Sequence, residues 1–535
     1  MTDYVKRLTL RQLLIMLLAF YWLVALNILW FNNGGHGFRL PYNLVCWVFM
    51  ALMALPVAMT LKRIRFSATG LWLLAGAVLI TLPAAWAPNA DALQASLPRL
   101  TGLWGGVAFY FILLQIRFDR QFITTLLIIL AAATVIESVV TLVCIWWPQF
   151  LPETLQQFAR EYTPQGFGVF EQRNVNASFL ATGYTGMLAL LVFYRGSIIR
   201  LCLTGAGVVF VSATLVLVES RIGWIGWATG TVAMSLMAHS RIGKDNSTEL
   251  QCRMLWVLPW VGIGLGIVFL KQSVGSVLDA HDGSNHQRLL TLIYTLKMIA
   301  LHPIKGWGLG MYMGEFQRFM ASLPVNPSKE IMGHPHNEVL YLWFEGGITA
   351  LLGGLCCAAG WLRLMHKRYS LWQWVALLMT LPVLLHTQVE YPLYFSVPHF
   401  FILLLLMRAA DKSTPTQLYA GPVSRCALSS VVLYGMLLAA QCFIAGQTLL
   451  KFEAYQLEDM ASIAELKVPR LMKQQWQQDM TMLRLVRFKH SRDNAELVAF
   501  MRETDRWLYI APDGALLTSR ESVDRFLSSY YKNRS

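Results

Sequence analysis

The sequence predicts an all-α, polytopic membrane protein with about thirteen transmembrane helices. Composition is the first observation behind this fold class: 56% of the 535 residues are hydrophobic and only 14% are charged, whereas a soluble protein carries roughly 25% charged residues. The second observation is that apolar stretches of about 20 residues, enough to cross a bilayer, recur along most of the chain. These stretches must be helical, because lipid offers backbone N–H and C=O groups no hydrogen-bond partner.

The apolar stretches divide the chain into four predicted parts. These are an N-terminal transmembrane bundle (1–272), a long loop (273–338), C-terminal transmembrane helices (339–447) and a charged helical tail (448–535). The expected spans are 12–31, 41–60, 70–87, 99–116, 122–147, 174–194, 199–219, 222–238, 254–272, 339–362, 371–388, 394–410 and 427–447.

Basic residues alternate between loops in a way that predicts the topology. With the N-terminus in the cytoplasm, the inner loops hold most of the Lys and Arg. The short outer loops hold only Arg39, Arg99, Arg160, Arg173 and Arg221. The net charge of +14 is therefore explained by basic residues that set the membrane topology. We expect no nucleic-acid partner. An odd number of spans then puts the C-terminus and both long segments outside.

The N-terminus and the cysteines complete this description. Lys6, Arg7 and Arg11 precede the first span and no small-residue cleavage site follows it, so we expect a retained span and not a removed signal peptide. The eight cysteines form no Cys-x-x-Cys pair and lie in spans or inner loops. We therefore expect neither disulfides nor a zinc site.

Polar residues that could take part in catalysis or binding are concentrated in five motifs, all of them predicted at the outer surface. The motifs are 166–176 with Arg173 and Asn174, 219–224 with Arg221, 286–288 with Arg288, 334–338 with His334, His336, Asn337 and Glu338, and 386–392 with Glu390 and Tyr391. One acid, Glu137, lies instead near the middle of a span. Intramembrane acids are often functional, but for Glu137 we expect a structural hydrogen bond inside the bundle.

The arginines are candidate ligands for a lipid phosphate. Arg221 follows a tight turn between two spans, so its guanidinium is expected at headgroup depth, where its planar fork of donors matches phosphate oxygens. Arg288 is a second candidate and Arg173 a weaker third. The alternative is that these side chains only snorkel to the interface or are solvated.

His336 is the candidate general base, since imidazole accepts and releases protons near neutral pH. The alternatives are a His-x-His metal pair with His334, for which clear further ligands are missing, and simple helix capping by Asn337 or Asn174. Glu390 has three interpretations beside that of a plain loop acid: it orients a histidine, holds a sugar hydroxyl or pairs with an arginine.

Several of these motifs together resemble a known family. Residues 220–224 (Ser-Arg-Ile-Gly-Trp), Arg288 with 303–310, and 336–340 (His-Asn-Glu-Val-Leu) resemble the Wzy/O-antigen ligase superfamily. Residues 171–178 and 389–392 are similar to its protein-directed branch, the PglL-type bacterial O-oligosaccharyltransferases. The resemblance covers the chain from about residue 160 to 400, and the charged tail is also similar to that branch.

The resemblance implies a glycosyltransferase in a bacterial inner membrane with its active site facing the periplasm. Its donor would be an oligosaccharide on undecaprenyl pyrophosphate, and its acceptor a Ser or Thr hydroxyl of a periplasmic protein such as a pilin. Transfer would be inverting, without metal or other cofactor. The alternatives are a ligase to lipid A–core, an O-antigen polymerase and, less favoured, a lipid-linked glycan transporter.

The expected roles divide the motif residues into two groups. His336, Arg288 and Arg221 are expected to be catalytic, as the base and the pyrophosphate ligands. The expected substrate-binding residues are Arg173, Asn174, His334, Asn337, Glu338, Glu390 and Tyr391.

Overall fold

The computed structural model describes residues 9–532 except 31, 33, 154, 157–165, 194–196, 240–246, 271–281, 327–330, 367–369, 412–415 and 455–462. Lys6, Arg7 and Arg160, and parts of the predicted long loop and tail, lie outside the described residues. Described segments fall into an all-α bundle with one short two-stranded sheet.

The predicted fold class is confirmed. In the described part, ten helices are long and apolar enough to cross a membrane, and two shorter apolar stretches lie at Leu371–His386 and Val397–Ala410. The helices of the bundle are α1 (Leu10–Leu23), α2 (Pro41–Thr60), α3 (Ala68–Thr81), α4 (Ala90–Leu114), α5 (Arg120–Trp146), α7 (Arg173–Phe193), α8 (Ile198–Leu217), α9 (Arg221–His239), α10 (Ser247–Phe269), α14 (Glu338–Leu362), α15 (Leu371–Leu378), α16 (Leu381–His386), α18 (Val397–Ala410) and α19 (Pro422–Ala454). α9 occupies the predicted span 222–238 but is not among these twelve apolar segments.

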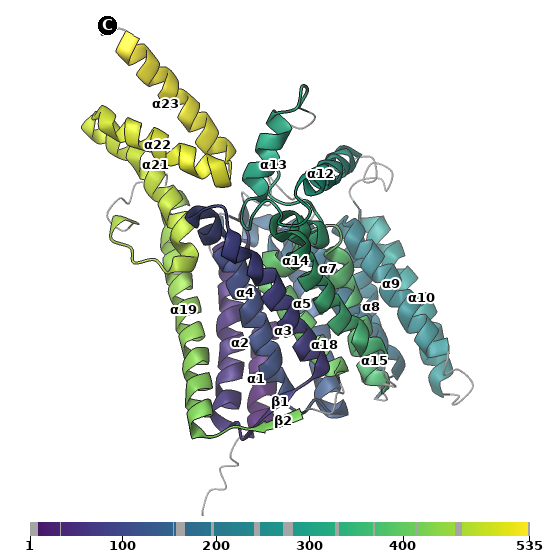
Figure 1. Cartoon of the computed structure of the whole chain (residues 1–535). Helices are drawn as coiled ribbons and strands as arrows, with labels where there is room; N and C mark the ends of the chain where they lie inside the picture. The colour runs from purple at the N-terminus through teal and green to yellow at the C-terminus, as the bar shows by residue number, and fades with distance from the viewer. Residues whose placement is uncertain are drawn as a thin grey trace, which may run out of the picture.

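The long loop and the tail lie at one end of the bundle, here called the loop-rich end. Figure 1 shows α12 (Asp282–Leu301), α13 (Tyr312–Ala321) and the tail helices α21 (Lys473–Ser491), α22 (Asn494–Ile510) and α23 (Gly514–Lys532) gathered there. Contacts that attach the tail include the ion pair of Arg506 with Asp91 and the hydrogen bond from Arg318 to the carbonyl of Tyr509. The helical tail is as predicted.

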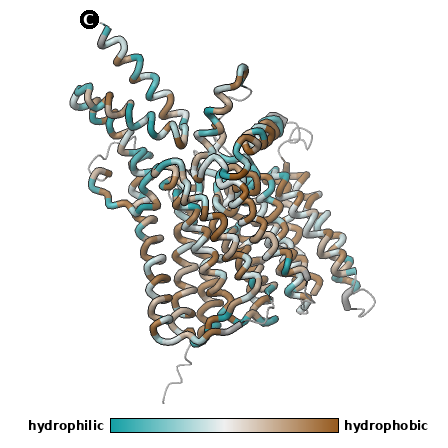
Figure 2. The backbone as a smooth tube through the Cα atoms, in the orientation of Figure 1, coloured by the Kyte–Doolittle hydropathy of each residue, from teal (hydrophilic) through white to brown (hydrophobic). Residues whose placement is uncertain are grey.

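The opposite end carries a short sheet that the sequence did not predict. β1 (Arg63–Phe66) and β2 (Thr416–Tyr419) pair antiparallel, with Arg63 opposite Tyr419, and Figure 1 places them at the far end of the bundle from the tail. Their pairing puts the loop after α2 and the loop before α19 on one side, as the predicted topology requires. In Figure 2, hydrophobic residues dominate the bundle and hydrophilic residues dominate the tail.

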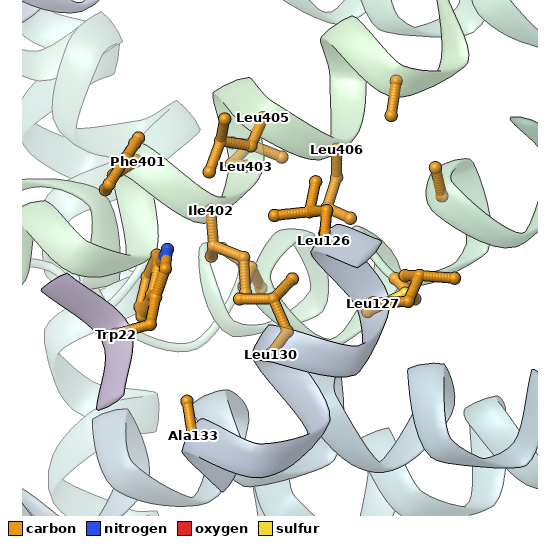
Figure 3. Packing of buried hydrophobic residues seen from close by; sticks show 14 of the residues in the cluster. Trp22, Leu126, Leu127, Leu130, Ala133, Phe401, Ile402, Leu403, Leu405 and Leu406 are labelled. Atoms are coloured by element: carbon orange, nitrogen blue, oxygen red, sulfur yellow. The ribbon is translucent and has the colours of Figure 1, made fainter. Parts of the chain in front are cut away.

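The bundle is organised around α7, whose apolar window is entirely buried inside the protein. Trp22 of α1 stacks on Phe179 of α7 and on Phe401 of α18, with ring centroids 5.7 and 5.4 Å apart. Figure 3 shows side chains of α5, including Leu126 and Leu130, packed against Ile402 to Leu406 of α18. Because α7 is enclosed, polar groups at its start must find partners inside the protein.

The glycine-rich motif 303–310 shapes the entry of the long loop. α14 is kinked at Gly347, which has φ +62°. The carbonyls opened there accept hydrogen bonds from the loop: Phe344 O accepts from Trp307 N–H at 2.7 Å, and Glu345 O accepts from Gly308 N–H at 3.0 Å. A Cβ on Gly306 would lie 2.5 Å from the nitrogen of Gly347. Glycine is therefore required at Gly306 by close approach and at both positions by positive φ.

We expect Gly76→Leu to destabilise the protein. α3 and α14 cross at backbone distance, because a Cβ on Gly76 would lie 2.7 Å from the carbonyl oxygen of Gly353. Overpacking of this kind costs about 1–3 kcal/mol, which thermal unfolding in detergent measures. Gly264→Leu is the control, since no heavy atom lies within 4 Å of a Cβ there. Equal unfolding temperatures for the two variants would contradict this packing.

Candidate active site

Glu390 is the centre of the polar cluster at the loop-rich end. Its Oε1 accepts hydrogen bonds from Asn174 Nδ2 at 2.7 Å and Arg288 Nη2 at 2.9 Å. Its Oε2 accepts from Gln172 Nε2 at 2.7 Å and lies 3.1 Å from His386 Nε2. These partners come from the start of α7, from α12 and from the end of α16, so one carboxylate joins three distant segments. Of the three interpretations of Glu390, pairing with an arginine and with a histidine are both observed.

The Glu390 carboxylate is ionised despite its burial. Burial raises the pKa of a carboxyl, but the hydrogen bond from His386 and electrostatic interactions with His386, Arg288 and His336 outweigh it and bring the pKa of Glu390 to about 2. A fixed negative charge therefore lies among the arginines at neutral pH.

The three predicted arginines are linked to one another near this charge. Arg288 binds Glu390 directly, and Arg221 donates to Asn285 Oδ1, three residues before Arg288 on α12. The charges of Glu219, Glu390, Arg288 and Arg221 all act on Arg173, the first residue of α7. Arg173 therefore lies within the influence of two carboxyls and of the other two guanidinium groups.

The tight turn before α9 is fixed to the same network. Glu219 has φ +55°, a left-handed conformation, and Ser220 Oγ donates to Asn174 Oδ1 at 2.8 Å. Asn174 in turn donates to Glu390. Burial raises the pKa of Glu219, against the charge of Arg173. Glu390 therefore helps to fix the position of Arg221, because Glu390 binds Asn174 and Asn174 binds Ser220, the residue before Arg221.

His336 lies beside this cluster in a strained backbone conformation. Its φ is +56°, and its backbone N–H donates to His334 Nδ1 at 2.8 Å, which leaves the ring proton of a neutral His334 on Nε2. Burial lowers the pKa of His336; Glu390 opposes that shift and Arg288 adds to it. A neutral imidazole, able to accept a proton, is the result at neutral pH.

The remaining predicted residues connect two loops. Asn337 Oδ1 accepts from Leu340 N–H at 2.9 Å, so Asn337 caps α14, which was the alternative to a substrate role, and its Nδ2 donates to Gln388 O at 3.2 Å. The backbone of Glu338 donates to Thr387 O at 3.0 Å. Tyr391 lies against the His334 ring, with centroids 4.1 Å apart. Motif 334–338 is therefore held against motif 386–392.

Glu137 makes the expected structural bond. Its Oε1 accepts from the backbone N–H of Val169 at 2.9 Å, which fixes the segment before α7. Metal binding finds no support in the described residues, among which no group of three His, Cys, Asp or Glu side chains is placed to hold an ion.

Sequence analysis missed a buried chain of polar groups behind Glu390. His386 Nδ1 lies 2.9 Å from Ser178 Oγ, which lies 3.2 Å from His399 Nε2, and His399 Nδ1 lies 2.8 Å from Ser396 Oγ. These side chains are all fully buried. The available signal was a histidine four residues before Glu390, together with a serine and a histidine inside apolar spans.

It also missed the partner of Arg99. Arg99 pairs with the buried Glu345 of α14, and its guanidinium lies 4.4 Å from the ring centroid of Tyr341. An acid inside the predicted span 339–362 was the signal, because an acid there requires a partner.

Comparison with known proteins finds two protein families that match parts of this chain. Residues 206–355 match the O-antigen ligase family. Over these residues this membrane protein is similar to O-antigen ligases. The matched residues include Arg221, Arg288 and His336.

Glu390 and Tyr391 fall in a second match, in which residues 374–503 match the C-terminal region of virulence factor membrane-bound polymerases. The chain is 29% identical to the O-antigen ligase of Salmonella typhimurium strain LT2 over an aligned segment of 121 residues. That alignment covers 18% of the chain and spans only 29% of the length of that relative.

We expect Glu390→Ala to lower stability, because Arg288, Asn174 and His386 would lose their buried acceptor. Leaving such groups unpaired costs about 1–3 kcal/mol, measured as a lower unfolding temperature in detergent. Glu249→Ala is the matched control: Glu249 pairs with Arg253 on the surface, with side chains 62% and 73% exposed, and exposed pairs contribute about 0–1 kcal/mol. A Glu390→Ala protein as stable as the control would rule out this role of Glu390.

Proposed function

We propose that this protein transfers a preassembled oligosaccharide from undecaprenyl pyrophosphate to a Ser or Thr hydroxyl of periplasmic, pilin-like proteins. The observation that carries the proposal is the gathering of Arg173, Arg221 and Arg288 around one carboxylate, with the neutral His336 beside them. This arrangement combines an anion site with a proton acceptor, the two elements that glycosyl transfer from a pyrophosphate needs. The loop-rich end would face the periplasm of a bacterial inner membrane.

In the proposed reaction the acceptor oxygen attacks the anomeric carbon while the bond from that carbon to the pyrophosphate oxygen breaks. His336 takes the proton of the acceptor hydroxyl, and undecaprenyl pyrophosphate leaves with the bonding electrons. Direct displacement inverts the anomeric centre. Arg221 and Arg288, assisted by Arg173, stabilise the charge that grows on the leaving group, which in many enzymes is the largest catalytic contribution.

The other motif residues would position the sugar and the base. Two buried nitrogens of the described region, His334 Nε2 and His336 Nδ1, have no protein hydrogen-bond partner. Buried polar atoms are rarely left so, which supports substrate contacts at both rings. Asn174 and Glu390 would hold the arginines in place, and Asn337, Glu338 and Tyr391 would bind sugar hydroxyls.

The protein acceptor is the more specific part of the proposal. Its support is that the two segments similar to the protein-directed branch meet: Gln172 and Asn174 of motif 166–176 both bind Glu390 of motif 386–392. Lipid A–core is the alternative acceptor, favoured by the likeness to a Salmonella O-antigen ligase. A polymerase that joins repeat units is a third, since residues 374–503 match membrane-bound polymerases.

Purified wild-type protein given a defined lipid-linked oligosaccharide is expected to glycosylate a pilin, and His336→Ala is expected to lose that activity. A missing general base typically lowers the rate by about 10²–10⁴-fold, which gel-shift or mass spectrometric detection of glycosylated pilin measures. His286→Ala is the control, because His286 is exposed on α12, two residues before Arg288.

If glycan is found only on lipid A–core, then lipid A–core and not a protein is the acceptor. Chains of repeat units that form without an acceptor would favour a polymerase. Retained transfer by the His336→Ala variant would remove His336 as the base.

The pH dependence of transfer follows from His336. Since a base must be unprotonated, and since burial and Arg288 lower the pKa of His336 while Glu390 opposes them, kcat/KM should fall only as the pH drops below the ordinary histidine value of about 6.5. Glu390, with a pKa of about 2, stays ionised across this range. Initial rates between pH 4.5 and 8 (roughly the window around that value) measure this fall of kcat/KM at acidic pH. A fall with its midpoint above pH 6.5 would contradict the assignment of His336 as the base.

A further inference from the structure

Behind Glu390 lies a buried row of polar side chains, here called the serine–histidine chain, which consists of Ser396, His399, Ser178 and His386. All four residues are 0% exposed. Neighbouring members lie 2.8–3.2 Å apart, and His386 Nε2 completes the row at 3.1 Å from Glu390 Oε2. In the described structure none of the four is hydrogen-bonded to an arginine or to the candidate base. Any effect of the chain on the reaction must therefore pass through Glu390.

The hydrogen positions at the start of this chain follow from a carbonyl, which can only accept. His399 Nε2 lies 2.9 Å from Val175 O, so this nitrogen carries a hydrogen. The hydrogen-bond contacts of His399 in the described structure are to Ser396, Val175 and Ser178, and none of these is an acid. Because a buried imidazolium without an anion is unfavourable, the ring is neutral. Its Nδ1 is then an acceptor, and Ser396 Oγ donates to it at 2.8 Å.

Ser178 has one hydrogen to donate and two neighbouring acceptors. Its Oγ lies 2.9 Å from His386 Nδ1 and 3.0 Å from Val175 O. A carbonyl oxygen has two lone pairs. At Val175 one of them accepts the backbone N–H of Phe179 within α7, and the other accepts from His399 Nε2. The hydrogen of Ser178 is therefore directed at His386 Nδ1.

This direction decides the tautomer of His386. Since Nδ1 accepts from Ser178, the hydrogen of the neutral ring is on Nε2, which faces Glu390 Oε2. The other tautomer would place two lone pairs against each other, at Nε2 and at Oε2. From Ser396 to Glu390 all four donors thus point the same way, and each bond polarises and strengthens the next.

His386 is the firmly anchored partner of the Glu390 carboxylate. The Arg288 side chain is 27% exposed, whereas His386 is 0% exposed and is backed by Ser178 inside the bundle. Without an N–H at His386, Oε2 of Glu390 would keep one donor among the described residues, Gln172. The carboxylate would then be free to rotate, and Arg288 would lose its fixed position.

We propose that His386 is a positioning residue of glycosyl transfer: the serine–histidine chain keeps its hydrogen on Nε2, so that it fixes Glu390 and, through Glu390, the guanidinium of Arg288. This inference rests on the proposed function, in which Arg288 stabilises the leaving pyrophosphate, and adds a residue that touches no substrate. The competing explanation is that the chain only stabilises the bundle.

The first experiment determines the tautomer by solid-state NMR of the full-length protein in lipid bilayers, with isotope-labelled histidine. The signal of His386 is identified by its loss in the His386→Gln variant. We expect a neutral ring with hydrogen on Nε2 in the wild-type protein. In Ser178→Ala we expect a mixture of both tautomers, because the donor to Nδ1 is removed. Hydrogen on Nδ1 in the wild-type protein, or an unchanged signal in Ser178→Ala, would overturn the proposal.

The second experiment measures transfer from a defined lipid-linked oligosaccharide to the acceptor that the wild-type protein uses. Ser178→Ala is expected to lower kcat by about five- to tenfold, the effect of roughly one hydrogen bond. KM for the donor should change little, because Arg288 acts on charge that grows in the transition state.

Ser212→Ala is the matched control for this measurement. Ser212 is also 0% exposed and accepts a hydrogen bond from Trp227 Nε1 at 3.1 Å, but it belongs to α8 and lies outside the serine–histidine chain. A wild-type kcat in Ser178→Ala, or an equal loss of kcat in both variants, would contradict the positioning role.

Two variants of His386 separate positioning from packing. His386→Gln keeps a side-chain N–H for Glu390 and is expected to retain more activity than His386→Leu. In the His386→Leu background, Ser178→Ala should lower kcat no further, because no ring remains for it to orient. Equal activity of the Gln and Leu variants, or a further loss of the same size in the double variant, would rule out action through His386.

Because the tautomer is measured without substrate, the two proposals can fail separately. The expected tautomers without transfer to any acceptor would remove the proposed activity and leave the serine–histidine chain as the support of Glu390. Transfer by a wild-type protein with hydrogen on Nδ1 of His386 would keep the activity and remove His386 as its positioning residue.

Discussion

A buried, ionised carboxylate organises the loop-rich end of this protein. Glu390 joins α7, α12 and α16 because each contributes a donor to its two oxygens. Desolvating a carboxylate is unfavourable by several kcal/mol unless such donors replace water, so these segments are positioned by the same requirement. The arginines would repel one another without this charge. The arginine cluster is thereby assembled without a ligand, which is the preorganisation that the proposed electrostatic catalysis requires.

Two of the arginines are held by different kinds of partner. Arg288 is bound to Glu390 and held rigidly, whereas Arg221 is held by a neutral amide, Asn285. Arg288 is therefore fixed in position by its ion pair with Glu390. His336 lies between the opposing influences of Glu390 and Arg288 on its pKa. Any group that displaces Arg288 from Glu390 would change the basicity of His336 as well.

Much of the fold was predictable, because hydrophobicity over 20 residues is a local property. Less predictable were features set by distant contacts: the pairing of β1 with β2, the kink at Gly347 and the division of span 371–388 into α15 and α16, with Pro382 at the start of the second. At the site, charged residues in outer loops were found because such residues stand out in an apolar sequence. Ser178 and His399 were missed, since a single polar residue within a span does not reveal which partner it will meet.

The geometry of α9 shows how a membrane bundle can join two opposite environments with one helix. Its glycine face is held against α7 by close backbone approach, and its first turn is held by the bond from Ser220 to Asn174, the residue that also binds Glu390. With both constraints on one side, the opposite face is free to carry Arg221 at the interface and Trp224 in the hydrocarbon region. A shift of α9 along its axis would break the glycine contacts and the Ser220 bond together. The positions of Arg221 and Trp224 are therefore fixed by the packing of α9 on α7, and not by the loops.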